Sequence, residues 1–382
     1  MAQAFEQGPI RPPSEARSLL IRVTRNCPWN NCEFCNIYKG KSFSRRSVQE
    51  VKEDIRKARA IYEEIQSVSW RMGFAGKLED PVIQAIWTDP RRFGDAHRSI
   101  AAWMYFGAKS AFLQDANSLI LDAEELAEIL EFLKQTFPSI ERITSYARSS
   151  TLRRKTLEEL QLLARAGLNR IHVGMESGYD PLLRFMKKGV TAQGHVEAGR
   201  KVVEAGISLS EYMLLGLGGR RWWREHAIES AKVLNQINPH FIRLRTLTVR
   251  RGMPLNEKVL SGEFQLQSEE EIVREERLFI ETLEGITSQV TSDHILNLLE
   301  EVEGKLPQDK ERMLQVIDEY LGLPQRDKLV YNLGRRAHAY RSVKDLADIG
   351  LRRRVEAALD RFLEENREDL DGAFNQLRNE FI

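Results

Sequence analysis

The chain has 382 residues, of which 42% are hydrophobic and 30% charged, and its formal net charge is +1. The composition is that of a soluble globular protein, and this charge gives no general reason to expect binding to nucleic acid or membranes. The first 20 residues lack the apolar core of a signal peptide, and no apolar run reaches the roughly 18 residues that span a bilayer. We therefore expect a cytoplasmic protein of one large domain with an appendage, or of two domains.

After an N-terminal arm at residues 1–17, which we expect to be exposed, short β-rich runs alternate with longer helical stretches. Strands are predicted at residues 19–24, 110–115, 142–147, 170–175, 208–218 and 241–249. Helices are predicted at residues 47–66, 122–137, 156–167, 191–206 and 225–237. Two of these helices end in Ala-Gly, which is a common C-terminal cap. The alternation predicts βαβ units and a parallel sheet within residues 18–256.

Two regions depart from this alternation. Residues 67–109 hold three of the six tryptophans and predict a helical insertion between the first helix and the second strand. Residues 257–382 are rich in Glu, Lys, Arg and Leu with helical periodicity, so we expect an all-helical C-terminal region. The sequence GLPQRDK at residues 322–328 predicts a break within it.

All the cysteines of the chain lie in one short stretch, CPWNNCEFC, directly after the first predicted strand. They are Cys27, Cys32 and Cys35. An odd number of thiols cannot form only disulfides, and soft sulfur ligands favour zinc or an iron–sulfur cluster. A zinc site would need a fourth ligand, and the nearest histidine in sequence is His97. Buried inert cysteines and a redox pair with a spare thiol are further alternatives. A cluster with three cysteine ligands and one open iron explains the odd number.

With Phe34 directly before the third cysteine, this stretch resembles the cysteine motif of the radical S-adenosylmethionine (radical SAM) superfamily. The usual spacing there is CxxxCxxC, and this chain has one additional residue in the first spacer. The resemblance implies a partial (β/α)6 barrel of the TIM type, with a [4Fe-4S] cluster on the three cysteines and S-adenosylmethionine (SAM) on the fourth iron. It also implies reductive cleavage of SAM to a 5′-deoxyadenosyl radical that abstracts hydrogen from a substrate, with a reductant such as flavodoxin or ferredoxin.

In barrels of this kind, functional residues collect at the carboxyl ends of the strands. At the end of the second strand, Gln114, Asp115 and Asn117 stand where the superfamily binds the amino group of SAM. An ordinary Asp/Asn turn is the alternative interpretation. At the end of the third strand, Ser145 and Arg148 are candidates for further cofactor contacts.

The fourth and fifth strands carry the remaining cofactor candidates. RIHVGMESG resembles the ribose motif of the superfamily and assigns Glu176 to the sugar hydroxyls. Twelve residues later, Lys188 stands where related families have an arginine that binds the SAM carboxylate, with Lys187 as the fallback. LGLGG resembles the adenine motif through Gly216, although a tight turn would also explain this glycine.

Four further side chains at these strand ends are candidates for substrate contacts: Tyr146, His172, Arg243 and Arg245. The two arginines project on one face of the sixth strand and predict a basic rim. Such a rim suits an anionic substrate with a carboxylate or phosphate, while the alternative is a rim of solvated or ion-paired arginines.

The order of these motifs resembles most the iron–sulfur oxidoreductase branch that includes coproporphyrinogen dehydrogenases and methylthiotransferases. The chain has no cysteines for an auxiliary cluster, and we expect no cobalamin-binding domain before residue 18. This leaves single-cluster chemistry on an unidentified substrate. A competing hypothesis is an RNA-modifying enzyme, for which Trp222 and Trp223 among neighbouring arginines would supply a binding patch. A non-enzymatic zinc protein is the other competitor.

Overall fold

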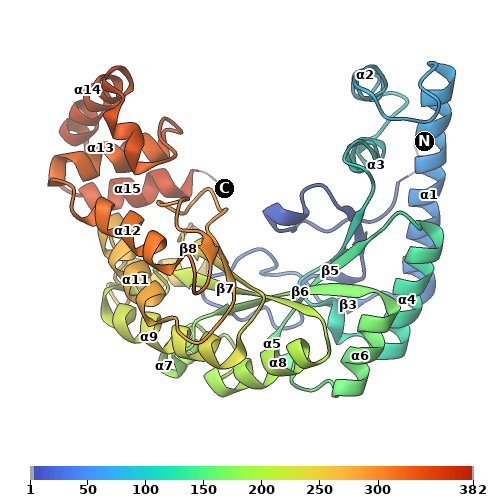
Figure 1. Ribbon diagram of the computed structural model, residues 1–382, viewed down its shortest axis with the longest axis horizontal. Coiled ribbons are helices and arrows are strands. Elements are labelled where there is room, and N and C mark those ends of the chain that lie inside the picture. Colours follow the sequence, from blue (N-terminus) through green and yellow to red (C-terminus); the bar gives the residue numbers. More distant parts are fainter. Residues whose placement is uncertain (1–3, 381–382) are drawn as a thin grey trace. The chain divides into compact units, whose positions relative to one another are not determined.

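The structure is a computed structural model that describes residues 4–380 (Figure 1). Within these residues the chain divides into two compact units. Unit 1 takes in residues 4–28, 40–173 and 201–209, and unit 2 takes in residues 29–39, 174–200 and 210–380. Among the residues described, no helix is long and apolar enough to cross a membrane.

Unit 1 is built on parallel strands in the order β1-β4-β5-β6. Their bounds are β1 Leu19–Arg22, β4 Ser110–Gln114, β5 Arg142–Ala147 and β6 Leu168–Glu176, of which the last three residues belong to unit 2. The helices α1 (Val48–Arg71), α4 (Ala123–Thr136) and α6 (Leu157–Ala166) pack side by side along these strands (Figure 1). The predicted α/β class with mainly parallel strands is confirmed.

The bounds of these helices follow from local capping. Ser47 and Glu50 form a capping box at the start of α1, and Thr156 and Glu159 form one at the start of α6. The α6 helix ends at Gly167, whose φ of 114° is left-handed and suits glycine. The Ala-Gly signal in the sequence therefore marked a true helix end.

The region between α1 and β4 is helical, as predicted. It contains α2 (Asp80–Thr88) and α3 (Asp95–Tyr105), and α1 itself continues to Arg71. Trp103 is buried and meets Phe137 edge to face, with ring centroids 5.1 Å apart. Trp70 and Trp87 are exposed.

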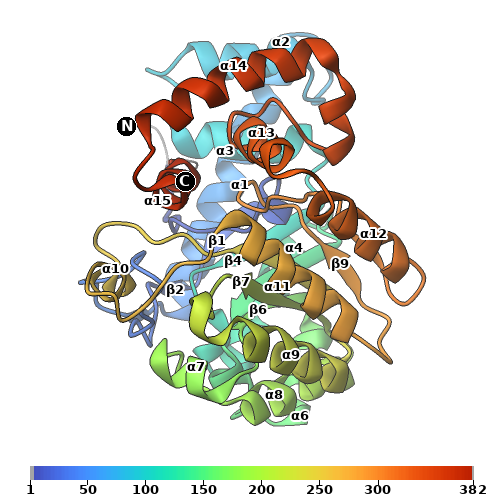
Figure 2. The same cartoon turned by 90° about the vertical axis from the view of Figure 1, so that its left-hand side faces the viewer.

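Unit 2 contains β7 (Ser208–Leu215, from Ser210 onward), β8 (Phe241–Thr246), β9 (Gln289–Thr291) and β10 (Gly304–Lys305). The helices α9 (Gly219–Ile237) and α11 (Glu269–Thr282) pack against each other (Figure 2). Its helices are α7 Asp180–Phe185, α9 Gly219–Ile237, α10 Pro254–Leu260, α11 Glu269–Thr282, α12 Lys310–Leu321, α13 Gln325–Arg336, α14 Ile349–Glu365 and α15 Leu370–Asn379. The predicted break at residues 322–328 coincides with the short connection between α12 and α13. Helix α8, Ala192–Glu204, is divided between the two units, and α5, Ser149–Leu152, belongs to unit 1.

The C-terminal region requires one correction to the predicted fold, because it is not all-helical. Strand β9 pairs in parallel with β8, with Phe241 opposite Gln289, and β10 pairs antiparallel with β9. The edge of β8 would otherwise present unpaired backbone groups, and β9 satisfies them. Strands of three and two residues are too short to give a periodic signal in the sequence.

The predicted N-terminal arm is exposed only in part within residues 4–17, and its residues 1–3 lie outside the described residues. Phe5 is 8% exposed and Glu15 is fully buried. The Glu15 carboxylate accepts hydrogen bonds from the Ser18 hydroxyl at 2.5 Å and from the Arg142 guanidinium at 3.0 Å. The polar, proline-containing sequence of the arm is typical of a linker, and Arg142 lies 127 positions away in the chain.

Candidate active site

The cysteine-bearing segment joins two short strands, β2 (Thr24–Arg25) and β3 (Ser44–Arg45), which pair antiparallel. In unit 1, Asn26 precedes Cys27 and has a left-handed φ of 68°, a conformation that asparagine tolerates. The Asn26 backbone N–H donates to Asp115 Oδ2 at 3.1 Å, and its side-chain amide donates to the Ser42 carbonyl at 2.6 Å. The approach to Cys27 is therefore fixed from the end of β4.

In unit 2, Cys32 and Cys35 lie on a segment held by the chain after α7. The backbone N–H of Glu33 donates to the Met186 carbonyl at 3.0 Å. All three cysteines are partly buried. Within residues 4–380, no three His, Cys, Asp or Glu side chains are gathered closely enough to hold a metal ion. The assignment of the cysteines as cluster ligands therefore stays a prediction.

The two polar side chains at the end of β4 are engaged within unit 1. The Gln114 amide accepts from Gly8 N–H at 2.8 Å and donates to the Gly8 and Ile10 carbonyls at 3.0 and 2.7 Å. Asp115 is fully buried and accepts two hydrogen bonds from the Arg22 guanidinium, at 2.5 and 2.8 Å. Their predicted contact with the SAM amino group stays a prediction.

Asn117 and Arg148 lie in the turns that follow β4 and β5, while Ser145 lies within β5. Asn117 accepts from the Arg148 backbone N–H at 3.1 Å and donates to the Thr151 hydroxyl at 2.8 Å. The buried Ser145 hydroxyl donates to the Tyr146 carbonyl at 3.1 Å. These contacts agree with the turn interpretation, and cofactor contacts of the three residues stay predictions.

Tyr146 and His172, two of the predicted substrate residues, lie close together in unit 1. Their ring centroids are 5.9 Å apart, and Tyr146 meets Phe112 edge to face at 5.1 Å. His172 is fully buried, with Nε2 3.9 Å from a Glu15 carboxylate oxygen. The segment that carries Glu15 therefore lies against this part of the strand face, which sequence patterns alone did not indicate.

At the end of β6 in unit 2, Glu176 forms an ion pair with Lys188, with Oε1 and Nζ 3.2 Å apart. Glu176 has a left-handed φ of 66°, which residues other than glycine seldom adopt and which often marks functional positions. Lys188 Nζ also lies 5.6 Å from the centroid of the Phe34 ring. Lys187, the fallback candidate, pairs with Glu33 at 2.5 Å instead. The structure therefore favours Lys188 of the two lysines.

Glu211, in the middle of β7, is a candidate that the sequence interpretation missed. Its side chain is almost fully buried, and among the residues described its Oε2 has no hydrogen-bond partner. Burial raises the pKa of Glu211 well above 4.5, the nearby Lys188 lowers it, and Glu176 raises it further. A glutamate within an otherwise apolar strand core was the available signal.

Gly216 follows β7 with a left-handed φ of 83°. Its backbone N–H donates to a carboxylate oxygen of Glu275 at 2.8 Å. Glu275 is completely buried, and this burial raises its pKa to about 8. The glycine is thus required by a turn held from α11, and its contact with adenine stays a prediction.

Arg243 and Arg245 on β8 share one counter-charge. Both guanidinium groups donate to Asp293 at 2.9 Å, each to a different carboxylate oxygen. The Arg245 guanidinium also stacks over the Tyr212 ring, 4.9 Å from its centroid. Its buried Nη2 has no hydrogen-bond partner in the described part of the chain. Two cations with one carboxylate leave capacity for an additional anion.

The run of arginines and tryptophans at the start of α9 is partly used within unit 2. Arg220 pairs with Glu271 at 3.0 Å and with Asp371 at 2.8 Å. Trp222 packs edge to face on Phe185, with centroids 5.0 Å apart. Two members of the predicted RNA-binding patch are therefore already engaged in internal contacts.

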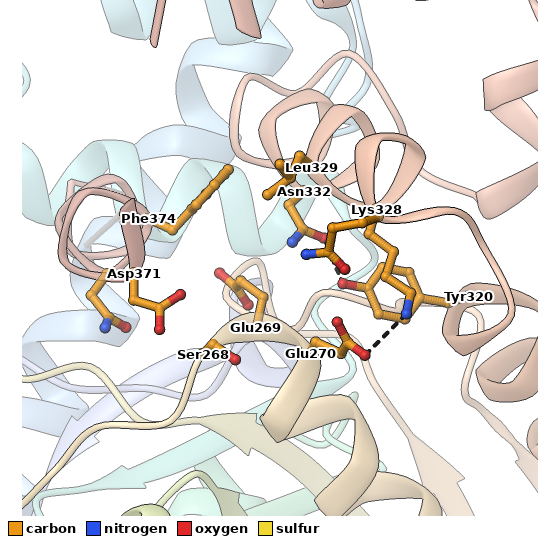
Figure 3. Close-up of a pocket in the computed structure, with 11 residues that line it drawn as sticks. Ser268, Glu269, Glu270, Tyr320, Lys328, Leu329, Asn332, Asp371 and Phe374 are labelled. Carbon is orange, nitrogen blue, oxygen red and sulfur yellow. Dashed lines mark hydrogen bonds and ion pairs between the residues drawn. The ribbon is translucent and has the colours of Figure 1, made fainter. Parts of the chain in front are cut away.

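A hollow among the C-terminal helices of unit 2 is lined by side chains from α11, α12, α13 and α15 (Figure 3). Lys328 pairs with Glu270 at 3.0 Å, and the Tyr320 hydroxyl donates to Asn332 at 2.8 Å. Figure 3 shows these side chains directed toward one another. Since these polar groups satisfy each other, this hollow offers no evident chemistry.

Residues 97–231, from α3 into α9, match the family model of the radical SAM superfamily. Over these residues the chain is similar to the radical SAM superfamily. Radical SAM proteins are enzymes that use a [4Fe-4S] cluster and SAM, which agrees with the predicted cofactors. The match confirms the predicted family, and it does not include the cysteine-bearing segment.

Two curated relatives come from Methanocaldococcus jannaschii. An uncharacterized protein is 24% identical over 152 residues, which are 40% of this chain and 46% of the relative. A tRNA uridine(34) acetyltransferase is 22% identical over 117 residues, 30% of this chain and 22% of the relative. The chain thus spans less than half the length of these relatives.

Among solved structures, coproporphyrinogen III oxidase from Escherichia coli is similar to this chain. The sequence identity is 15%, with 69% of this chain and 52% of the other covered, and the TM-score is 0.43. The structure of that protein is described as that of a radical SAM enzyme.

The residues at hand fit the cofactors of a radical SAM enzyme. Three thiols in one segment are the donor set that binds three irons of a cluster and leaves the fourth open. In unit 2, a Cβ atom at Gly174 would lie 2.2 Å from the Glu176 carboxylate and 3.2 Å from Lys188 Nζ, so a larger residue there would displace these side chains from their present positions. The buried Glu211 oxygen without a partner adds a polar group that a ligand can satisfy.

Proposed function

We propose that this enzyme binds a single [4Fe-4S] cluster through Cys27, Cys32 and Cys35 and cleaves SAM reductively. The cofactors supply an electron and a 5′-deoxyadenosyl radical, which removes a hydrogen atom from a small-molecule substrate. The observation that carries this proposal is the Glu176–Lys188 ion pair at the end of β6. It occurs in a chain whose three cysteines follow the strands β1 and β2. A reductant such as flavodoxin or ferredoxin would deliver the electron.

The Glu176–Lys188 pair is suited to exchange its internal contact for contacts with SAM. Both side chains are partly accessible, at 17% and 12%, and they form an ion pair with each other. The ribose hydroxyls would donate to Glu176, while the SAM carboxylate would pair with Lys188. A ligand that offers both groups replaces one ion pair with two charge-assisted contacts.

The other proposed SAM contacts are secondary to this pair. Backbone at Gly216 would approach the adenine, and Phe34 would pack beside the cofactor. The polar side chains of unit 1 would take up the amino group after exchanging their present hydrogen bonds: Gln114, Asp115, Asn117, Ser145 and Arg148.

The substrate that we propose is an anion. Arg243 and Arg245 share a single carboxylate, and the Nη2 group of Arg245 is buried without a hydrogen-bond partner among the residues described. A carboxylate or phosphate of the substrate would satisfy this donor in the planar geometry that guanidinium groups favour. Tyr146 and His172 are proposed to contact the same substrate.

The proposal is tested by anaerobic reconstitution with iron and sulfide, followed by reduction in the presence of SAM. We expect about four irons and four sulfides per chain and formation of 5′-deoxyadenosine. The single variants Cys27→Ala, Cys32→Ala and Cys35→Ala should each abolish 5′-deoxyadenosine formation. One zinc per chain without sulfide would contradict the proposal and favour a zinc protein.

A second candidate function is modification of RNA, because one relative is named a tRNA uridine(34) acetyltransferase. The net charge of +1 and the internal use of Arg220 and Trp222 weigh against it. Binding to total tRNA at low salt, with loss of binding as salt rises, would favour this function. Deuterium transfer into 5′-deoxyadenosine from a fractionated pool of small molecules would favour the first.

A further inference from the structure

We propose that Glu6 is a positioning residue for the segment that carries Cys27, and that residues 4–10, here named the N-terminal segment, are part of the cluster site. The inference concerns contacts within unit 1 only. It rests on the proposed function in one respect, which is that Cys27 is a cluster ligand.

The Glu6 carboxylate gathers three arginines around it. It accepts a hydrogen bond from Arg22 Nη1 at 2.9 Å, and from Arg25 Nε and Nη2 at 2.8 and 2.7 Å. Arg46 Nε lies 3.6 Å away. Arg25 therefore binds Glu6 in the two-pronged geometry that gives the strongest ion pairs. All three arginines flank the cysteine-bearing segment, two before it and one after it.

Hydrogen bonds to other parts of unit 1 hold the backbone of the N-terminal segment, so the position of Glu6 is fixed. The Glu6 backbone N–H donates to Asp54 at 3.2 Å, and Gly8 exchanges two hydrogen bonds with the Gln114 amide. A Cβ atom at Gly8 would lie 2.2 Å from Asp115 Oδ1, so this approach to the end of β4 requires glycine.

Two carboxylates hold the residues before Cys27 from different directions. Asp115 binds the Arg22 guanidinium and accepts from the Asn26 backbone N–H. Glu6 binds the same Arg22 and also Arg25, which lies two residues before Cys27. Glu6 is therefore linked to Cys27 by the Arg25 side chain and by the short backbone segment from Arg25 to Cys27.

Without Glu6, Arg25 would lose its principal partner. The remaining carboxylate near it, Glu50, lies 3.3 Å away, is exposed, and already caps α1. The Arg22 pair with Asp115 would remain. The expected result is a local loosening at residues 25–27 while the strands stay folded, because losing hydrogen bonds between charged groups affects mainly the segment they hold.

The test measures thiol accessibility in the metal-free full-length chain, so it does not depend on cluster formation. Alkylation by iodoacetamide is followed over time at each cysteine by tandem mass spectrometry, in the wild type and in Glu6→Gln. We expect Cys27 to react about tenfold faster in the variant, which corresponds to losing one charge-assisted hydrogen bond. Cys32 and Cys35 should be unchanged and serve as internal references.

Two further variants separate positioning from general stabilisation. Glu6→Asp keeps the charge and should restore much of the Cys27 protection. Glu63→Gln removes an exposed carboxylate that pairs with Arg59 at 2.8 Å on α1, and it should leave all three rates unchanged. The melting temperature of each variant is measured in parallel. Equal acceleration at all three cysteines, or none at Cys27, would overturn the inference.

A second readout follows after reconstitution. The electron paramagnetic resonance spectrum of the reduced cluster should change in Glu6→Gln and not in Glu63→Gln, because only the first variant alters the surroundings of a ligand. If the wild type forms no cluster, the proposed function fails, while the alkylation rates still decide whether Glu6 positions Cys27.

Discussion

Two groups of acidic side chains, one in each unit, differ in how completely their charges are compensated. In unit 1, Asp115 and Glu6 meet Arg22, Arg25 and Arg46, so that each carboxylate accepts hydrogen bonds from at least one guanidinium. In unit 2, Glu176 and Glu211 lie near a single cation, Lys188, and the Glu211 oxygen Oε2 is buried without a partner in the described chain.

The difference in charge compensation indicates a structural role for the unit 1 carboxylates and a binding role for those of unit 2. A compensated network holds backbone in place, since its carboxylates are paired and removing one leaves a guanidinium charge in a low-dielectric environment. An under-compensated group costs stability in the absence of a ligand and gains hydrogen bonds when one arrives. We therefore expect Asp115 to act mainly on the fold and on the cysteine-bearing segment, and the Glu176 group to act on ligand affinity.

The largest expected effect is that of Asp115→Asn, and its absence would contradict the comparison between the two groups. Removing one charge of a buried pair should lower the free energy of unfolding by about 3 kcal/mol, because Arg22 is left without its closest counter-charge. Urea unfolding of the metal-free protein measures this. Asp122→Asn, at an exposed position 4.0 Å from Arg45, is the matched control. A change below about 0.5 kcal/mol would show that the unit 1 network is not structural.

The next effect concerns SAM binding. Glu176→Gln keeps the shape of the side chain but loses the charge that accepts hydrogen bonds from the ribose, so SAM affinity should fall about tenfold, or roughly 1.4 kcal/mol. Isothermal titration with the reconstituted protein gives the dissociation constant, and the iron content should be unchanged. Glu229→Gln, which removes a surface carboxylate paired with Lys232 at 2.8 Å, is the control. Unchanged affinity would remove Glu176 from the site.

The smallest effect is the pH dependence that Glu211 imposes on stability. Because burial raises its pKa above the unfolded value of 4.5, the folded state keeps a proton that the unfolded state has lost. The free energy of unfolding therefore falls as pH rises from 4.5 to the raised pKa of Glu211 in the folded state. Glu211→Gln carries no titrating proton, so it should differ from wild type by under about 0.5 kcal/mol near pH 4 and be the more stable protein at pH 8.

Denaturant unfolding at several pH values checks the Glu211 prediction. The buried acids Glu275 and Glu276, whose pKa burial raises to about 8, contribute the same downward slope to both proteins. The difference between variant and wild type therefore isolates Glu211. A constant difference across pH 4–8 would show that Glu211 is ionised in the folded state, with a counter-charge that compensates it.

Much of the unit 1 and unit 2 architecture could be predicted, because strand and helix signals are local. The periodic runs predicted the strands within a few residues, and the Ala-Gly ending correctly marked the end of one helix at Gly167. Strand β9 escaped prediction, since its three residues form a strand only through pairing with the edge of β8.

The residues of the candidate site likewise differ in whether the sequence alone could indicate them. Cys27, Cys32 and Cys35 stand out because their residue type and spacing specify a donor set before any folding is considered. Glu211 did not stand out, since its importance comes from complete burial near Lys188, and burial is a property of the packed chain.

The sequence by itself determined the succession of strands and helices, the three-thiol stretch and the resemblance to a superfamily, because each depends on residues close together in the chain. Only the tertiary structure decided which charges are compensated. Glu6 meets Arg46 across 40 positions, Asp115 meets Arg22 across 93, and Glu15 meets Arg142 across 127. Ion pairs at such separations in sequence form only because folding brings distant segments together, and no local sequence pattern specifies which segments meet.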